Sequence, residues 1–438
     1  MTIRTLLALF LAGILTSIGA TPTPTAALSD MQQLQQVSTI STLSGTTQPI
    51  NVGFGNQTNP HVACNNASYT DDNFEGSSSI KYFDFATSSE HAVPGNGLDR
   101  LSDTDGQRIA FTQLEADGDH IILYDITSQT ITSVPGTKNF LPVFGGNLVA
   151  FVHMPPSIPS SSEIEVYDQN TGNVTQLTND TLLDRFPQVS ADGSVVVWEK
   201  CQTDGTGCDI YSATQTGPGA FTTRLLTGAG EDHFPATNGE LVAYISDKSG
   251  ENDIYFQRVS GSTEMHLSIP GDQRDLRMSG NLVVFESGFP GGYDVFLYDL
   301  STARLYQVTN TPGVDETLSD IVTGCDGVNR IVYAAPGAGD FNVYGFTFQL
   351  NDSVNDQLND LIALVRSFNL HDGTENSLIS KLQDSLTAIG NSDTATACSS
   401  LTAFINASQA QSGKKLSPAQ VKQLVDAATQ VKSDLGCN

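Results

Sequence analysis

The chain has 438 residues, with 48 acidic against 20 basic side chains and a formal net charge of −28. This balance argues against nucleic acid or an anionic membrane surface as the main partner, because both require clustered Lys and Arg to neutralise phosphate. Charged residues make up only 16% of the chain, and 39 glycines accompany many Ser, Thr, Asn and Asp residues. The composition therefore indicates a β-rich extracellular protein with many turns.

The N-terminal segment has the features of a secretory signal peptide. Arg4 supplies a positive charge, Leu6–Ile18 is dominated by apolar residues, and Ser17–Ala20 offers small residues for cleavage. The alternative is an uncleaved anchor, but the apolar run is shorter than the roughly 20 residues of a spanning helix. We predict a signal peptide over 1–20, a flexible leader over 21–36, and a mature protein without a transmembrane segment. That protein would be secreted, periplasmic or attached to the cell surface.

Residues 37–350 repeat themselves. Each unit contains an apolar run that ends in an aromatic residue, and these aromatics are 40 to 48 residues apart. They are Tyr69, Phe111, Phe151, Trp198, Tyr244, Phe285 and Tyr333. Such a period, with several short alternating strands per unit, is typical of a β-propeller. We predict seven blades, or six if the degenerate first unit is not a full blade. The aromatic column should form the core between blades.

The seventh unit has no evident fourth strand before the helical tail. Ile40–Gly45 resembles the last strand of other units, such as Ile131–Gly136. We therefore predict that the N-terminal strand over 40–45 completes the last blade and closes the ring, which leaves no open sheet edge.

The even number of cysteines, six, favours disulfides in an exported protein. Cys64 and Cys325 lie at or beside equivalent turns of the first and last units, which ring closure makes neighbours. Cys201 and Cys208 flank a short turn within one unit and would clamp a hairpin. Cys398 and Cys437 then remain to link the tail.

Residues 351–438 change from the period of strands to that of helices. Apolar spacing predicts helices near 353–368, 374–389, 393–411 and 418–435. Ser417 followed by Pro418 is a good N-cap with proline at the first helical position. We predict a compact helical domain, for which the Cys398–Cys437 link would be a useful staple.

Two segments resemble known families. Asp184–Gly193, Trp198 and Asp209–Tyr211 are similar to the repeats of TolB-like β-propellers, over about 300 residues. The tail looks like the FIMAH domain of bacterial extracellular proteins; the segments that carry this likeness are Ser367–Leu370, Glu375–Leu378, Lys381–Leu382, Ala403–Ile405 and Ser412–Lys415. The resemblance implies a secreted bacterial protein whose propeller binds a partner and whose tail has no established chemistry.

Contiguous catalytic motifs for serine hydrolysis, zinc proteolysis or phosphate binding do not occur, and the seven histidines are scattered singly. A lone histidine such as His153 or His233 is more often structural than a metal ligand, since a metal site needs three or four converging groups. Dispersed sites do occur on propellers, so an enzyme is not excluded.

A repeated position is the main candidate site. Alignment of the units places an acidic or amide residue just before each innermost strand, at Asp99, Asn139, Asp184, Asp232, Asp272 and Asp315. Such a ring at one channel mouth could hold Ca²⁺, the one cofactor we consider, or attract a cationic or sugar-like partner. The alternative, which we favour, is that these groups accept hydrogen bonds within the repeats. A second column opens the third strand of each unit and is interpreted as turn-capping: Glu163, Asp209, Asp253, Asp294 and Asn342.

Two classes of function follow. The first is a binding or scaffold protein without catalysis, whose propeller mouth recognises an extracellular protein or a glycan. The second is a carbohydrate-active enzyme, a polysaccharide lyase or glycosidase, with a dispersed site in the mouth. A cluster of His, Arg and carboxylates in one mouth would distinguish the second class. Because the chain has many acids but few basic residues, the sequence favours the binding protein. It does not predict the oligomeric state.

Overall fold

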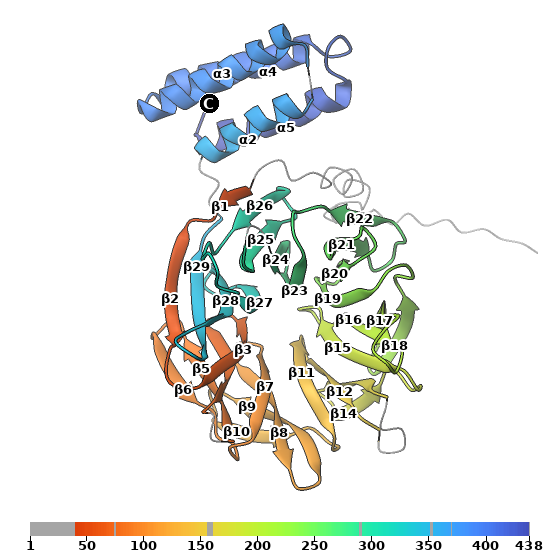
Figure 1. Ribbon diagram of the computed structural model, residues 1–438. Helices are drawn as coiled ribbons and strands as arrows, with labels where there is room; N and C mark the ends of the chain where they lie inside the picture. Colours follow the sequence, from red (N-terminus) through yellow and green to blue (C-terminus); the bar gives the residue numbers. More distant parts are fainter. Residues whose placement is uncertain are drawn as a thin grey trace, which may run out of the picture.

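The computed structural model describes residues 40–73, 76–155, 161–288, 291–350, 354–368 and 370–437. In these ranges the chain forms seven β-sheets arranged as blades around a central axis, followed by helices (Figure 1). The predicted seven-bladed propeller with a small helical domain is thus confirmed, and the six-blade alternative is wrong. The predicted signal peptide and leader lie outside the described residues.

Each blade is a meander whose first strand lies nearest the axis, and we number the blades in chain order. Blades one to three consist of β3 (Asn56–Ala63), β4 (Asn66–Asp72), β5 (Ser78–Asp84) and β6 (Ser89–Ala92); β7 (Asp99–Thr104), β8 (Arg108–Glu115), β9 (Gly118–Asp125) and β10 (Thr130–Ser133); and β11 (Asn139–Gly145), β12 (Leu148–His153), β13 (Glu163–Asp168) and β14 (Asn173–Gln176). Blades four and five consist of β15 (Leu183–Val189), β16 (Val195–Cys201), β17 (Asp209–Gly217) and β18 (Ala220–Leu225); and β19 (Asp232–Thr237), β20 (Leu241–Ser246), β21 (Asp253–Arg258) and β22 (Glu264–Leu267).

The last two blades share the N-terminal segment. Blade six contains β23 (Gln273–Ser279), β24 (Leu282–Ser287), β25 (Asp294–Asp299) and β26 (Arg304–Gln307), with β1 (Ile40–Thr42) as a fifth strand; blade seven contains β27 (Thr317–Thr323), β28 (Asn329–Pro336), β29 (Phe341–Phe348) and β2 (Gly45–Asn51). The ring closes as predicted through an N-terminal strand, but that strand is β2, antiparallel to β29. The segment predicted to close it, 40–45, instead runs parallel to β26 through β1.

The aromatic residues that defined the repeat form the core of the blades. Six of them are completely buried, and Tyr333 is 5% exposed. They sit on the second strand of each blade, where neighbouring blades contribute to the same apolar clusters. Burying a large side chain contributes roughly 1.5 to 3 kcal/mol, so this column is a main source of ring stability.

Each innermost strand carries one non-glycine residue in the left-handed backbone region, with φ between 49° and 56°. These residues are Asn59, Leu101, Leu141, Phe186, Phe234, Asp275 and Leu318. The strand register shifts at each of them, so every inner strand has a bulge that redirects the following side chains. The previous blade stabilises some of these bulges: the Leu101 amide donates to Thr70 Oγ1, and the Leu141 amide to Thr112 Oγ1.

The seam between blades seven and one is covalent as well as hydrogen-bonded. The structure contains the three predicted disulfides, and Cys64–Cys325 crosses this seam with a Cα–Cα distance of 4.6 Å. The Arg330 guanidinium donates to the carbonyl of Cys64, and the Phe341 amide donates to Asn56 Oδ1. The two ends of the repeat are therefore fastened at several points.

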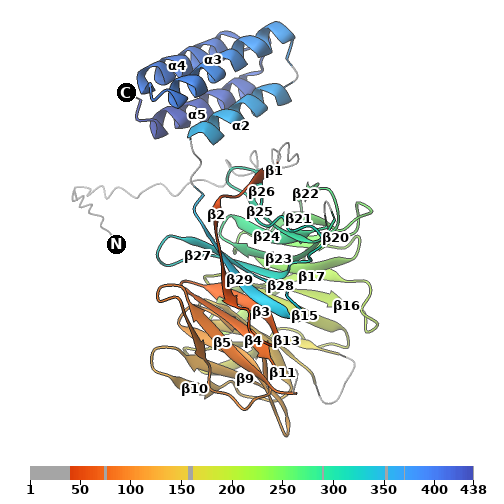
Figure 2. The same cartoon turned by 60° about the vertical axis from the view of Figure 1, so that its left-hand side comes forward.

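The helices lie beside blade six, near β1 and β26 (Figures 1 and 2). They are α2 (Val354–Ser367), α3 (Asp372–Gly390), α4 (Thr394–Ala410) and α5 (Pro418–Asp434), close to the predicted bounds. Leu358, Leu382, Leu401 and Phe404 are completely buried in their shared core. An ion pair between Arg304 of β26 and Asp360 of α2 links the helices to the propeller.

Candidate functional site

The bulges place one residue per blade in what we call the axial ring. Its members lie two positions after each left-handed residue: His61, Asp103, Val143, Gln188, Ala236, Arg277 and Asp320. Contacts between blades bring three of them together, because His61 lies against both Asp103 and Asp320, and the charge of Arg277 also acts on Asp320. Blades six, seven, one and two thus contribute to one group of titratable side chains.

His61 lies between two carboxylates. Its Nδ1 is 3.6 Å from Asp103 Oδ1 and 3.4 Å from Asp320 Oδ2. Each carboxylate is also fixed to the next blade: Asp103 Oδ2 accepts from the amide of Phe144 at 2.6 Å, and Asp320 Oδ2 accepts from the amide of Val62 at 2.9 Å. The three side chains are 11 to 14% exposed, so they are held rigidly yet remain within reach of solvent.

The two carboxyl groups differ in acidity. Burial raises the pKa of Asp103 to about 6, although the nearby His61 opposes the shift. Burial also tends to raise the pKa of Asp320, but its hydrogen bond to His61 and the charges of His61 and Arg277 hold that pKa below its ordinary value. Adjacent groups whose pKa values are separated by their environment are a common basis of general acid–base chemistry.

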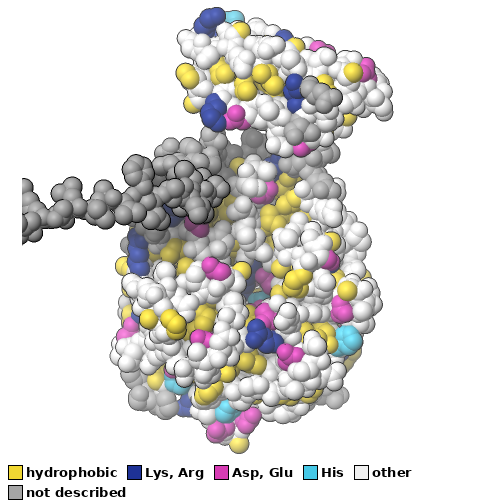
Figure 3. Space-filling view, turned by 180° about the vertical axis from the view of Figure 1, so that it is seen from behind, with side chains coloured by type: hydrophobic (Ala, Val, Ile, Leu, Met, Phe, Trp, Pro, Cys, Tyr) yellow, Lys and Arg dark blue, Asp and Glu magenta, His cyan; other side chains and the backbone are white. Residues whose placement is uncertain are grey.

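Basic side chains gather at the start of the same inner strands, directly before the bulges. Arg100, Arg185, His233 and Arg274 hold equivalent positions there, and the three arginine side chains are 32 to 39% exposed. Each of them pairs with at least one carboxylate, so basic and acidic side chains alternate at this level of the inner strands. Figure 3 views the ring from behind and shows basic, acidic and histidine side chains around its central hollow.

Two buried glutamates anchor these basic residues. Glu199 accepts from Arg185 Nε at 2.5 Å, and its other oxygen lies 3.3 Å from His233 Nδ1. Glu286 holds the equivalent position opposite Arg274, whose Nε is 3.8 Å away. Arg274 also covers the ring of Tyr293 at 3.6 Å from its centroid, a cation–π contact.

The predicted acidic positions lie elsewhere. Asp99, Asn139, Asp184 and Asp232 are at most 1% exposed, so they are not open to a channel mouth. Three of them hold partners in their own blade: Asp99 accepts from Gln113, Asn139 contacts His153, and Asp184 accepts from Trp198. Both oxygens of Asp232 lack a hydrogen-bond donor, and Lys248 Nζ is 3.9 Å from one of them.

Asp272 and Asp315 are one residue away from the repeated position. The structure places Gln273 and Glu316 there, both buried. Asp272 and Asp315 are exposed and fix the previous blade, since they accept from the amides of Asn252 and Tyr293 respectively.

The second acidic column meets the first between neighbouring blades. Asp209 acts electrostatically on Asp232, and Asp294 on Glu316. Glu163 lies close to Asp184 in the same way. Threonines help to cap these junctions: the hydroxyl of Thr309 contacts both Asp294 and Glu316. Turn-capping is thus part of the role of this column, as with Asp294, which also accepts from the amide of Thr311.

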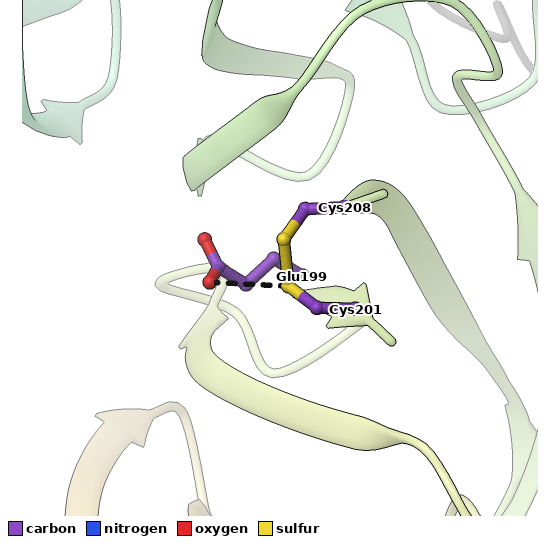
Figure 4. A group of neighbouring side chains, drawn as sticks. All are labelled: Glu199, Cys201 and Cys208. Carbon is purple, nitrogen blue, oxygen red and sulfur yellow. Dashed lines mark hydrogen bonds between the residues drawn. A yellow bond between two sulfur atoms is a disulfide. The ribbon is translucent and has the colours of Figure 1, made fainter. Parts of the chain in front are cut away.

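The Cys201–Cys208 disulfide lies next to Glu199, the buried partner of Arg185 (Figure 4). Glu199 Oε1 is 3.7 Å from the sulfur of Cys201, and Cys208 lies beyond it. Both sulfurs are bonded to each other, so neither is a thiolate that could bind a metal together with Glu199, or with Glu231 and His233.

Sequence reasoning missed His61, Asp103, Arg277 and Asp320. They come from four separate units, and the axial ring mixes basic, acidic and apolar residues, so no column of like residues identifies it. The useful signal is the register after the bulge, and proline directly follows the left-handed residue in four blades, at Pro60, Pro142, Pro187 and Pro235.

Comparison with known proteins identifies the fold and no family. No protein-family model and no curated protein matches the chain. Among solved structures, the acylaminoacyl peptidase of Pyrococcus horikoshii matches with a TM-score of 0.52 and 14% identity, over 68% of this chain and 53% of the peptidase. The chain therefore spans about half the length of that peptidase.

Two other structures match over nearly their whole length. The β-propeller domain of the trilobed protease from Pyrococcus furiosus gives a TM-score of 0.52 at 12% identity, covering 68% of this chain and 96% of that domain. An oligogalacturonate lyase in complex with manganese gives a TM-score of 0.52 at 12% identity, covering 72% of this chain and 96% of the lyase. At these identities the likeness shows a shared propeller fold. TolB from Acinetobacter baumannii also matches, at a TM-score of only 0.40.

These findings correct the predicted function. The sequence favoured a binding or scaffold protein without catalysis, but the matched structures named above are peptidases or their domains and a lyase as well as TolB, and they do not favour non-catalytic binding. The prediction was wrong in its physical reason as well. It rested on a shortage of basic residues, whereas the fold gathers several of the few available ones around the axis beside carboxylates.

Proposed function

We propose that this chain is an extracellular carbohydrate-active enzyme, and specifically a lyase that cleaves uronate-containing polysaccharides at the propeller axis. The observation that carries the proposal is the placement of His61 between Asp103 and Asp320, together with the charge of Arg277 that acts on Asp320. This is the cluster of His, Arg and carboxylates that distinguishes an enzyme from a binding protein.

The cluster suits an elimination reaction. A base removes the proton next to the uronate carboxylate, the bond to the glycosidic oxygen breaks, and the departing oxygen receives a proton. His61, oriented by ionised Asp320, is the candidate base. Arg277 supplies the positive charge that stabilises the substrate carboxylate as the proton leaves. Asp103, with a pKa raised to about 6 by burial, can return a proton to the leaving oxygen.

Two features favour a lyase over the other enzyme classes. A glycosidase uses two carboxyl groups and has no need for an arginine that recognises a substrate carboxylate. The arginines at the start of the inner strands each pair with a carboxylate but stay about one-third exposed, which leaves guanidinium groups that an anionic polymer could contact. The peptidase match leaves about half of the peptidase uncovered, and the chain has no serine-hydrolase motif.

The test is turnover of a polysaccharide panel by the purified protein. We expect a rise in ultraviolet absorbance from the new double bond with polygalacturonate or alginate, and none with a neutral glucan. His61→Gln should lower kcat by about 100-fold or more, the usual loss for a general base. His91→Gln, on the exposed outer strand β6, is the matched control. Absence of turnover on all uronates, or full activity of His61→Gln, would contradict the proposal.

Export and the family resemblances belong to the same proposal. All six cysteines are in disulfides, which form in oxidising compartments. None of the helices in the described ranges combines the length and apolar character needed to span a bilayer. We propose that residues 1–20 direct secretion, that the propeller is TolB-like in its repeats, and that the tail is a FIMAH-like domain.

A further inference from the structure

The junction between blades three and four contains three carboxylates in close proximity. Glu163 begins β13 of blade three, Asp184 lies in β15 of blade four, and Asp180 lies in the connection between the blades. One oxygen of each carboxylate is within 4.8 Å of one oxygen of each of the others. At the corresponding junctions of the next blade and of blades six and seven, the facing pairs are Asp209 with Asp232 and Asp294 with Glu316.

Two of the oxygens at this junction are buried without a hydrogen-bond donor. Glu163 is 1% exposed and Asp184 is completely buried, yet Glu163 Oε2 and Asp184 Oδ2 accept no hydrogen bond of normal geometry, although the hydroxyl of Thr178 acts on Asp184. The other oxygens are engaged: Glu163 Oε1 accepts from the amide of Asp180, and Asp184 Oδ1 accepts from Trp198 Nε1 at 2.7 Å. A buried acceptor left without a partner costs roughly 1 to 3 kcal/mol, which a ligand could recover.

One lysine partly neutralises the group. Lys200 Nζ pairs with Asp180 and lies 3.3 Å from Asp184 Oδ1. A single ammonium leaves an excess of negative charge on three carboxylates, and it does not contact the two unpartnered oxygens. Asp180 is 40% exposed, so the group opens to solvent on that side.

We propose that Glu163, Asp180 and Asp184 form a Ca²⁺ site that ties blade three to blade four. Ca²⁺ binds carboxylate oxygens and accepts irregular geometry, and water can complete its coordination on the side of exposed Asp180. Lys200 is the internal competitor of the ion and moves aside on its flexible stem. The inference is independent of the proposed lyase activity, because the site is separate from the axial ring.

The single tryptophan of the chain allows a direct test. Trp198 donates to Asp184, so a Tb³⁺ ion bound at this site lies close enough to be sensitised by its indole. The experiment uses the purified protein, Tb³⁺ as the probe and Ca²⁺ as the displacing ion. We expect sensitised emission that Ca²⁺ abolishes and that excess Mg²⁺ leaves largely intact.

Matched variants test whether the sensitised emission comes from the proposed site. Glu163→Gln should weaken Tb³⁺ and Ca²⁺ binding by about tenfold or more, whereas Asp209→Asn, the equivalent residue of blade four, should change it less than about twofold. Lys200→Met should tighten binding by about tenfold, because it removes the competing charge. Circular dichroism confirms that each variant is folded, and the Lys200→Met result tests the site even if Glu163→Gln fails to fold. No sensitised emission from the wild type, or equal binding by Lys200→Met and wild type, would overturn the proposal.

Discussion

Glu199 and Glu286 occupy the same position in two blades but have opposite surroundings. Both are completely buried and lie opposite an arginine. Glu199 contacts Arg185, His233 and the amide of Phe234. Burial and the neighbouring charge of Asp275 raise the pKa of Glu286 well above its ordinary value, and its Oε2 has no hydrogen-bond partner. Burial therefore shifts Glu286 toward its neutral form, whereas Glu199 is held by three donors.

Replacing each glutamate by glutamine should change the free energy of unfolding by different amounts at the two positions. Glu286→Gln supplies a neutral group of similar shape, which the raised pKa of Glu286 favours, and should change the free energy of unfolding by less than about 1 kcal/mol. Glu199→Gln alters an acceptor shared by Arg185, His233 and the amide of Phe234, and should cost about 2 to 3 kcal/mol. Urea denaturation of both variants at neutral pH measures the difference. Equal losses would show that the donors around Glu199 do not set it apart from Glu286.

Asp103 predicts a pH dependence of stability. Its pKa is about 6 in the folded chain against an ordinary value of 3.8, so the folded state holds this proton more tightly than the unfolded state does. The stabilisation that protonation provides is therefore lost as pH rises from about 4 to 6, which would amount to at most about 3 kcal/mol. Asn does not ionise, so the Asp103→Asn variant keeps its stability as pH rises. Its free energy of unfolding should therefore increase relative to that of the wild type across this pH window.

Urea denaturation between about pH 4 and pH 7 tests the prediction. Asp105→Asn, at the nearby turn after β7, is a control that does not contact His61. If the unfolding free energies of wild type and Asp103→Asn run parallel over this range, the raised pKa is ruled out.

At the scale of the elements, sequence periodicity was sufficient for the blades and helices. Alternating strands and recurring aromatics depend on burial, which each segment expresses locally. The bulges were not predictable in the same way. Leu101, Leu141 and Phe186 adopt a conformation that favours glycine, and the amides of Leu101 and Leu141 donate to threonines of the previous blade, a contact distant in sequence. Because the axial ring follows the bulges, the candidate site was hidden for the same reason.

The error in the closing strand also has a local cause. The segment 40–45 resembles the outer strands of other units, and β1 does indeed pair at the outer edge of a blade. Similarity to an outer strand identifies the edge position and leaves the choice of blade open. Ile50 of β2 is buried with Phe83 and Val343, and this packing fixes the next segment in blade seven.

Helix α5 begins with a reciprocal cap that can be tested alone. Ser417 Oγ accepts from the amide of Gln420, and the Gln420 side chain accepts from the amide of Ser417. Ser417→Ala should lower the stability of the helical domain by about 1 kcal/mol. The control is Ser399→Ala on the exposed face of α4, where alanine should be neutral or slightly stabilising. Thermal unfolding followed by helical circular dichroism distinguishes the two, and equal effects would argue against the cap.

For the whole molecule, the seam disulfide should matter more than the hairpin disulfide. Cys64 and Cys325 are 261 residues apart, whereas Cys201 and Cys208 are separated by 7. On the chain-entropy view, the first link restricts the unfolded chain by about 5.5 kcal/mol and the second by about 2.5 kcal/mol. Replacing each pair by serine and measuring unfolding in urea should reproduce this order. The reverse order would show that the closing strand β2 already holds the seam.

Apart from the added edge strand β1, the first and last strands of the propeller, β2 and β29, are hydrogen-bonded neighbours, with Gly45 opposite Phe348. The chain therefore enters and leaves the ring at two adjacent positions. A module with this geometry can be spliced into a surface turn of a host protein without stretching the host. We expect residues 45–348 to serve as such a cassette, and retention of the host's own melting transition after grafting would measure how little the insertion disturbs it.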